Sequence, residues 1–406
     1  MRVLYAFLTV SLLFAATSAA AGQRLDKRVK IGVLTDLSSL YSSETGPGSV
    51  LAAQMAVADS GMTKKGWTIK VISADFQNSI DVGADIARQW FDHDNVDVIL
   101  DVPNSAVALA VSRVASEKNA VLLISGAGAS ELTGKDCSPN MVQWTYDTWM
   151  LAHGAAKAIV QAGGETWYFL AVDYVFGKEL ESEAAAVVKA HGGRILGESK
   201  HPLNAADFSS YLLQAKNSHA QVIALADAGG DAMNAIKQAH EFEIASGGQQ
   251  IAPLLFSISE VHALGLKVAQ GLEVTSAFYW DQNNGTRAFA KRFAARMKTH
   301  AMPTMAQAGV YASVLHYLKA LAALGGNPHN GREVVAKMKT IPTDDPLFGK
   351  GEIRVDGRTI HPAYLFKVKT PAESKGPWDL YKLVATIPAK DAFRPLDQGG
   401  CPLVKH

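Results

Sequence analysis

The strongest constraint on the fold is a regular alternation of short apolar, β-branched runs with amphipathic helical segments. Residues 29–37 read VKIGVLTDL, a strand-like run that ends in a turn, and residues 49–61 read SVLAAQMAVADSG, a helical pattern closed by Gly61. Further strand-like runs lie at 67–75, 96–102 and 120–125, separated by helical patterns at 82–95 and 105–119. Continuous apolar strands separated by helices predict a parallel sheet covered on both faces, which is a doubly wound α/β lobe.

The alternation breaks at residues 126–150 and then resumes, which indicates a second α/β lobe. Strand-like runs at 166–173, 194–203, 220–227 and 252–259 again alternate with helical patterns. The chain has 406 residues, more than the roughly 250–300 at which one hydrophobic core stops growing. Two lobes are therefore expected.

The helical patterns after about Thr275 have no strand-like runs of their own to cover, so we expect them to return to the first lobe. The tail reads as antiparallel hairpins with turns at 356–358 and 372–377. The chain then crosses between the lobes more than once. The predicted division is a signal peptide at 1–21, a first lobe from 28–147 and 278–356, and a second lobe from 148–277 and 357–406, which includes the C-terminal tail.

The N-terminus has the pattern of a secretory signal peptide. Arg2 precedes an apolar run at 3–16, and Ala19 and Ala21 have the A-x-A spacing of a cleavage site. The competing interpretation is a membrane anchor, but the run is shorter than the roughly 20 residues that span a bilayer. We therefore expect cleavage near Ala21 and a mature protein in the periplasm.

The chain has two cysteines, Cys137 and Cys401, each beside proline or glycine in a predicted loop. An exported compartment is oxidising, so two cysteines favour one disulfide. The alternative is two free thiols. No cysteine or histidine stands at metal-ligand spacing near either cysteine, and no metal site is expected.

Charge and motifs exclude several classes of function. A net charge of +1 gives no reason to expect nucleic acid or an acidic membrane as a partner. The chain lacks G-x-S-x-G, the phosphate-binding G-x-x-x-x-G-K-[ST] and the zinc motif H-E-x-x-H. We therefore expect neither an enzyme nor a bound cofactor, and we disfavour an exported hydrolase.

Ligands of open α/β sheets bind beyond the carboxyl ends of the strands, where this sequence places small polar, aromatic and acidic residues. In PNSAVAL, the Asn104 or Ser105 side chain can cap the next helix while free N–H groups face an anion. The alternative is that both residues only cap. In GAGAS, two glycines let the backbone approach a ligand closely. Trp144, Tyr146 and Trp149 are predicted to pack where the lobes join.

With these segments in hand, the sequence resembles the periplasmic ligand-binding proteins of ABC importers, specifically the leucine/isoleucine/valine-binding type. The resemblance rests on VKIGVLTDLSSLYSSETGPGSVLAAQMAVAD, DVILDVPNSAVALAVSRVASEKNAVLLISGAGASELTG, AVDYVFGKELE and NAIKQAHEFEI, and it covers essentially the whole mature chain. It implies a monomer with two lobes joined by a three-stranded hinge, which closes on a small solute and delivers it to a membrane permease. A sensory role, with the ligand presented to a membrane signalling protein, stays open as the alternative.

The resemblance also implies where a ligand binds. Asn104 and Ser105 match a carboxylate-binding serine region, Phe176 matches an aromatic of the cleft, and the acid for an α-ammonium falls near Ser257 to Glu260. Where that family has an alanine-x-threonine loop, this chain has no threonine. The predicted ligand-binding set is Tyr41, Asn104, Ser105, Ala127, Gly128, Ala129, Tyr174, Phe176, Asp227 and Glu260.

The expected ligand is a small organic carboxylate, either an aromatic acid or a branched-chain or other hydrophobic amino acid. The departures from the family pattern favour an aromatic or other non-amino-acid carboxylate. Tyr41, Tyr174 and Phe176 can supply flat apolar walls, and Asp227 can accept a hydrogen bond from a phenolic hydroxyl as well as from an ammonium.

Overall fold

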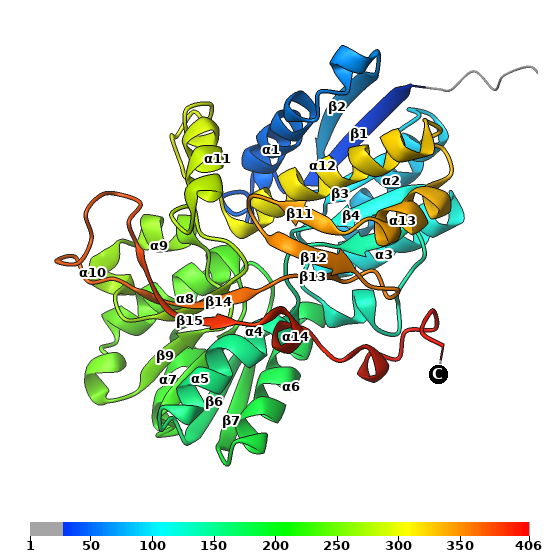
Figure 1. The fold of residues 1–406 in the computed structure, drawn as a ribbon. Coiled ribbons are helices and arrows are strands. Elements are labelled where there is room, and N and C mark those ends of the chain that lie inside the picture. The colour runs from blue at the N-terminus through cyan, green and yellow to red at the C-terminus, as the bar shows by residue number, and fades with distance from the viewer. Residues whose placement is uncertain (1–26, 406) are drawn as a thin grey trace, which may run out of the picture.

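The computed structural model describes residues 27–405, which form two parallel sheets, each flanked by helices (Figure 1). The first sheet has the strand order β2-β1-β3-β4-β5, and all its pairs are parallel. Its strands are β1 Arg28–Thr35, β2 Thr68–Asp75, β3 Val98–Asp101, β4 Val121–Ile124 and β5 Met141–Gln143. Every residue of β3 and β4 is buried, as expected for strands covered on both faces.

The helices of the first lobe come from both ends of the chain, as the sequence predicted. They are α1 Gly46–Asp59, α2 Ile80–Asp92, α3 Ser105–Glu117, α12 Met305–Leu324 and α13 Gly331–Thr340. Helix α12 packs on α1 and on β3 and β4, and α13 packs on α12 and β4. A capping box between Thr304 and Gln307 begins α12, and the left-handed Gly325 ends it. Helix α11 (Asn284–Ala294) also contacts α1.

The second lobe contains a parallel sheet of order β7-β6-β8-β9. Its elements are β6 Thr166–Val172, β7 Arg194–His201, β8 Val222–Ala226, β9 Gln250–Pro253, α4 Thr148–Leu151, α5 Lys157–Gln161, α6 Val175–Ala190, α7 Ser209–Asn217, α8 Gly229–Glu241, α9 Ile258–Leu264 and α10 Leu266–Ala269. Between α4 and α5 lies a π-helical turn at Ala152–Ala156. There Gly154 packs on Thr275, whose Oγ1 would lie 2.2 Å from a Cβ at this position. The doubly wound α/β class predicted from the sequence is confirmed.

The fold also contains two small antiparallel sheets. One has the order β10-β14-β15, from β10 Glu273–Ser276, β14 Ala363–Val368 and β15 Tyr381–Ile387. The other is formed by β11 Thr343–Asp345, β12 Gly349–Ile353 and β13 Thr359–Ile360. The predicted hairpins of the tail are confirmed by the β12–β13 and β14–β15 pairs. The residue boundaries of the two lobes stay predictions.

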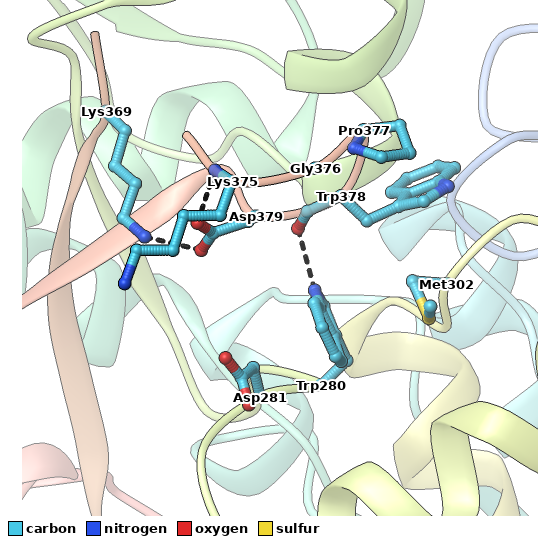
Figure 2. Close-up of a pocket in the computed structure, with 9 residues that line it drawn as sticks. All are labelled: Trp280, Asp281, Met302, Lys369, Lys375, Gly376, Pro377, Trp378 and Asp379. Atoms are coloured by element: carbon cyan, nitrogen blue, oxygen red, sulfur yellow. Dashed lines mark hydrogen bonds and ion pairs between the residues drawn. The ribbon is translucent and has the colours of Figure 1, made fainter. Parts of the chain in front are cut away.

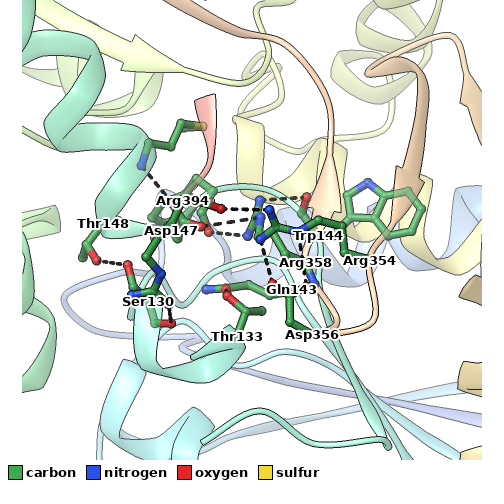
Figure 3. Close-up of polar contacts among 12 residues, drawn as sticks. Ser130, Thr133, Gln143, Trp144, Asp147, Thr148, Arg354, Asp356, Arg358 and Arg394 are labelled. Carbon is green, nitrogen blue, oxygen red and sulfur yellow. Dashed lines mark hydrogen bonds and ion pairs between the residues drawn. The ribbon is translucent and has the colours of Figure 1, made fainter. Parts of the chain in front are cut away.

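Arg358 lies where the crossings meet (Figure 3) and its side chain is fully buried. Its guanidinium donates to the carbonyl oxygens of Tyr146 at 2.9 Å and Trp144 at 3.2 Å. Its Nε lies 3.6 Å from Oδ2 of Asp147, and its Cζ lies 4.2 Å from the centre of the Phe393 ring. The buried Arg358 cation thus contacts both the chain segment that follows β5 and the C-terminal tail. It holds these two segments in fixed positions.

The tail returns to the first lobe after β15. Arg394 donates to the carbonyl oxygen of Ser130 at 2.9 Å, and its own carbonyl accepts from Arg354 (Figure 3). Cys137 and Cys401, which are 264 positions apart in sequence, form a disulfide, which confirms the predicted pairing. The predicted signal peptide lies outside the described residues. Within residues 27–405, no helix combines the length and apolar character that a membrane crossing requires.

Loss of the disulfide should lower the free energy of unfolding by about 2–5 kcal/mol, because the crosslink restricts the unfolded chain over a long loop. Urea denaturation of the Cys137→Ser, Cys401→Ser double variant measures this change. A reductant should bring the parent protein to the stability of the variant and leave the variant unchanged. Equal stability of parent and variant without reductant would contradict the prediction.

Replacing Arg358 with methionine should lower the free energy of unfolding by about 3–5 kcal/mol, because it leaves Asp147 buried without its cation and the Tyr146 carbonyl without its donor. The measurement is chemical denaturation followed by circular dichroism. Arg88→Met is the matched control, since the Arg88–Asp85 pair is exposed and should contribute less than about 1 kcal/mol. Similar losses in the two variants would show that Arg358 has no special role.

Candidate functional site

The carboxyl-end loops of the two sheets contact each other, and we call this contact the seam. On the first lobe it comprises residues 36–45 and 126–130, and on the second lobe residues 173–183, 227–230 and 257–260. The hydroxyl oxygens of Tyr41 and Tyr174 lie 2.9 Å apart across it. The amide of Gly230 donates to the carbonyl oxygen of Leu40 at 3.2 Å. The structure therefore brings strand ends from both lobes together.

A second set of contacts joins the GAGAS loop to α6. The Ser130 amide donates to Glu179 at 2.6 Å, and the Ser130 hydroxyl donates to Glu183 at 2.8 Å. A Cβ on Gly128 would lie 2.6 Å from the Tyr146 ring and 3.0 Å from the Phe176 ring. Glycine is required here because the backbone lies against two aromatic rings, whereas the sequence had suggested only the close approach of a ligand.

Asn104 and Ser105 both have protein partners. The Asn104 side chain accepts from the amides of Ala106 and Val107, so it caps α3. The Ser105 hydroxyl accepts from the amide of Ala129 at 3.2 Å and so braces the GAGAS loop against α3. The contacts of Asn104 are those of the capping alternative. The contact of Ser105 gives it a bracing role. Their part in ligand binding stays a prediction.

Free backbone donors remain in the same loop. Within residues 27–405, no hydrogen bond uses the amides of Ala127 and Gly128, although both residues are buried. Buried backbone N–H groups almost always have a partner. Two adjacent donors of this kind are suited to an anionic group.

Asp227 is engaged by a buried histidine. The Asp227 carboxylate lies 3.4 Å from Nε2 of His201, and neither side chain is exposed. Burial raises the pKa of Asp227 against the opposing effect of His201. For His201, burial lowers the pKa, but the hydrogen bond and charge of Asp227 outweigh it and the pKa is raised. His201 competes with any ligand group for Asp227, whose ligand role stays a prediction.

Glu260 is buried at the first turn of α9. Its Oε2 accepts from the Ser257 amide in a capping box, and its Oε1 has no partner within the described chain. Burial and the nearby charge of Asp227 raise the pKa of Glu260 to about 7, although hydrogen bonds from Ser257 oppose the shift. One oxygen thus has a structural role and the other is available to a ligand.

Glu44 is the acidic residue that sequence reasoning missed. It lies in the loop before α1, its exposed fraction is 3%, and Oε1 has no partner within residues 27–405. Burial raises its pKa well above the ordinary value, and Glu260 and Asp101 raise it further. Glu44 was overlooked because SSETGP has the composition of a solvated turn. Its position just beyond β1 was the signal that could have found it.

Asp101 lies nearby at the end of β3. It accepts from the Thr35 hydroxyl at 2.8 Å, and burial raises its pKa to about 7. Asp101 and Val102 both have left-handed backbone conformations, with φ of 79° and 50°. Such strain in residues other than glycine is concentrated at functional sites.

The aromatic residues divide between the seam and the core. The Tyr146 hydroxyl donates to the carbonyl oxygen of Gly126 at 2.6 Å, and Phe176 packs beside Tyr174. Trp144 is buried against His316, and Trp149 stacks on His153 with ring centres 3.9 Å apart. The contacts of Trp144 and Trp149 are those of packing residues, whereas Tyr146 reaches the seam.

A separate surface pocket of about 390 Å³ lies beside the loop between β14 and β15 (Figure 2). The indole N–H of Trp280 donates to the carbonyl oxygen of Trp378 at 2.8 Å, and Lys369 pairs with Asp379. Its polar groups are thus largely used within the protein. The lining residues are Trp280, Asp281, Met302, Lys369, Lys375, Gly376, Pro377, Trp378 and Asp379, none of them predicted from the sequence. The seam is the stronger candidate site.

Comparison with known proteins gives a consistent result. A sequence model described as periplasmic binding protein matches residues 28–377. A periplasmic binding protein from Burkholderia mallei is 48% identical, with 93% of this chain and 100% of that chain covered and a TM-score of 0.90. A branched chain amino acid ABC transporter periplasmic ligand-binding protein from Burkholderia xenovorans LB400 is 39% identical, with 92% and 99% covered and a TM-score of 0.81. A solute binding protein from R. palustris in complex with benzoate shares the fold at 19% identity, with 92% and 99% covered and a TM-score of 0.81.

From the raised pKa values of the buried acids at the seam, we predict that the free energy of unfolding falls as the pH rises from about 5 to 8. Unfolded glutamates lose their protons near pH 4.5, whereas folded Glu260 and Asp101 keep theirs until about 7. The folded state then binds more protons than the unfolded state over this window, so raising the pH favours unfolding. Urea denaturation at four pH values measures the slope.

Glu44→Gln and Glu260→Gln should each reduce this pH dependence, because glutamine does not titrate. Glu117→Gln, at an exposed position on α3, is the control and should leave the slope unchanged. Slopes of Glu44→Gln and Glu260→Gln that equal the slope of the parent protein would contradict the pKa directions of these two acids.

Proposed function

The chain belongs to the periplasmic binding protein family, and from this premise we propose that it captures one small organic solute between its lobes and delivers it to an ABC permease. A member of this family works outside the cytoplasm and is a binding protein, not an enzyme. The single observation that supports capture at the seam is that buried, unpartnered polar groups from both sheets converge there. Export through a cleaved signal peptide and action as a monomer are parts of the same proposal.

Closure of the two lobes would be the binding step. The contacts that a hinge motion would break include the Tyr41–Tyr174 hydroxyl pair and the bonds of Ser130 to Glu179 and Glu183. A ligand that contacts both lobes favours the arrangement in which these contacts exist. For this motion we propose the lobes predicted from the sequence, 28–147 with 278–356 and 148–277 with 357–406.

For the solute, the sequence favoured an aromatic carboxylate over an amino acid, and the charges at the seam favour the reverse order. A benzoate-like ligand has no cation that would stabilise the ionised form of the buried Glu44 and Glu260 carboxyls. An amino acid has an ammonium for these acids and a carboxylate for the free amides of Ala127 and Gly128. We therefore propose an amino acid with an apolar side chain, packed against Tyr146 and Phe176.

Isothermal titration should give a micromolar Kd for L-leucine, corresponding to about 8 kcal/mol of binding free energy. Benzoate and 4-hydroxybenzoate should bind at least about tenfold more weakly, because their carboxylate meets buried acids without a compensating cation. Tighter binding of benzoate would reverse the argument from charge. Absence of binding by all three solutes would contradict capture of these solute classes.

The Gly128→Ala substitution tests whether leucine binds at the seam. The added methyl group would lie 2.6 Å from the Tyr146 ring and 3.0 Å from the Phe176 ring, so it should block the close approach of the lobes and weaken leucine binding. Gly247→Ala is the matched control, because nothing lies within 4 Å of its added Cβ. Circular dichroism should show that both variants are folded. Equal leucine affinities in the two variants would show that leucine does not bind at the seam.

A further inference from the structure

Two glutamates of α6, Glu179 and Glu183, bind the end of the GAGAS loop across the seam. Oε2 of Glu179 accepts from the Ser130 amide at 2.6 Å, and Oε1 of Glu183 accepts from the Ser130 hydroxyl at 2.8 Å. The Ser130 hydroxyl also lies 2.6 Å from the Thr148 hydroxyl (Figure 3). The backbone and the side chain of Ser130 are thus both bound by α6.

Ser130 ends the loop whose free amides are proposed to bind the solute. Gly128 and Ala127 precede it in the loop, and no hydrogen bond within residues 27–405 uses their amides. Helix α6 also contacts α3, which begins beside this loop. Glu179 and Glu183 can therefore act on the solute through the position of the loop.

The surroundings of Glu179 disfavour its ionised form. Its Oε1 is buried and has no hydrogen-bond partner in the described part of the chain. Burial, with a contribution from the charges of Glu131 and Glu183, raises its pKa to about 8, although the amides of Ser130 and Glu131 oppose the shift. Lys135 is a neighbouring cation, but it is exposed and pairs with Glu131.

Glu183, one turn later on α6, has a similar environment. Its Oε2 is buried and lacks a hydrogen-bond partner among residues 27–405. Burial and the charge of Asp147 raise its pKa to about 7. The Thr148 and Ser130 hydroxyls and the charge of Arg394 oppose this shift. Below about pH 7, both glutamates therefore hold a proton while the lobes are in contact.

We propose that Glu179 and Glu183 are positioning residues that hold the lobes together through Ser130 in their protonated form, so that solute affinity falls when they lose their protons. This latch, formed by the three residues, rests on the proposed capture of a solute between the lobes. When the lobes separate, both carboxyls return to water, where the pKa of glutamate is about 4.3. The closed arrangement then binds more protons than the open one between about pH 4.5 and 8, so a rise in pH favours opening.

Glutamine at both positions imitates the protonated carboxyls and does not titrate. Isothermal titration with L-leucine should show that the Glu179→Gln, Glu183→Gln double variant binds about as tightly as the parent protein at pH 5.5. At pH 8 it should bind at least about tenfold more tightly than the parent. If the ionised carboxylates were merely structural, the variant would bind more weakly at both pH values. Glu117→Gln, exposed on α3, is the control and should match the parent throughout.

Small-angle X-ray scattering of the mature chain without solute tests the latch independently of any ligand. The radius of gyration of the parent protein should increase from pH 5.5 to pH 8 as the lobes separate, and this increase should be smaller in the double variant. Burial also raises the pKa of Glu44 and Glu260, so the difference between variant and parent, rather than the profile of the parent, tests the latch.

The outcomes distinguish the two proposals. If leucine binds and the double variant is no tighter than the parent at pH 8, the latch is wrong and solute capture stands. If leucine binds to neither protein at either pH, capture of leucine is contradicted, and the scattering decides the latch by itself. An equal increase in the radius of gyration of parent and variant would then contradict it.

Discussion

The relative placement of the two lobes depends on the burial of the Arg358 guanidinium. A fully buried guanidinium must be satisfied by acceptors in fixed positions, and here they are two carbonyls and one carboxylate of the segment 144–147. The Phe393 ring of the tail covers the same cation. Because Tyr146 supplies one of these carbonyls and its hydroxyl binds the Gly126 carbonyl, the interaction that orders the crossing also positions a wall of the seam.

Close backbone contact determines how the lobes meet. Gly128 lies against the rings of Tyr146 and Phe176, and Gly229 lies against Leu40 and Tyr41 with a left-handed φ of 63°. A side chain at either position would hold the loops apart. Burial is the largest cause of the raised pKa values of both Glu44 and Glu260, so these shifts depend on the lobes staying in contact.

The sequence predicted the fold more completely than the site, and the reason is physical. Strands, helices and their parallel order follow from local periodicity. The pairing of Cys137 with Cys401 followed from two cysteines in a chain expected in an oxidising compartment. The strand ends also indicated which loops would meet. The partner of each polar side chain, however, depends on contacts distant in sequence: Ser105 braces Ala129, and His201 at the end of β7 engages Asp227. Glu44 lies in a segment with the composition of a solvated turn, and its burial follows only from the tertiary fold.

A seam of buried acids makes the closed arrangement sensitive to charge. Without a cation, Glu44 and Glu260 reduce the cost of burial by keeping their protons; with a cation beside them, both can ionise and gain from the attraction. The same desolvation that destabilises the solute-free protein therefore strengthens its interaction with a cation, because a low-dielectric seam strengthens every charge pair within it. Stability without solute and affinity for solute are opposed at these two residues. A more stable seam, lined with apolar side chains, would close without discriminating between solutes.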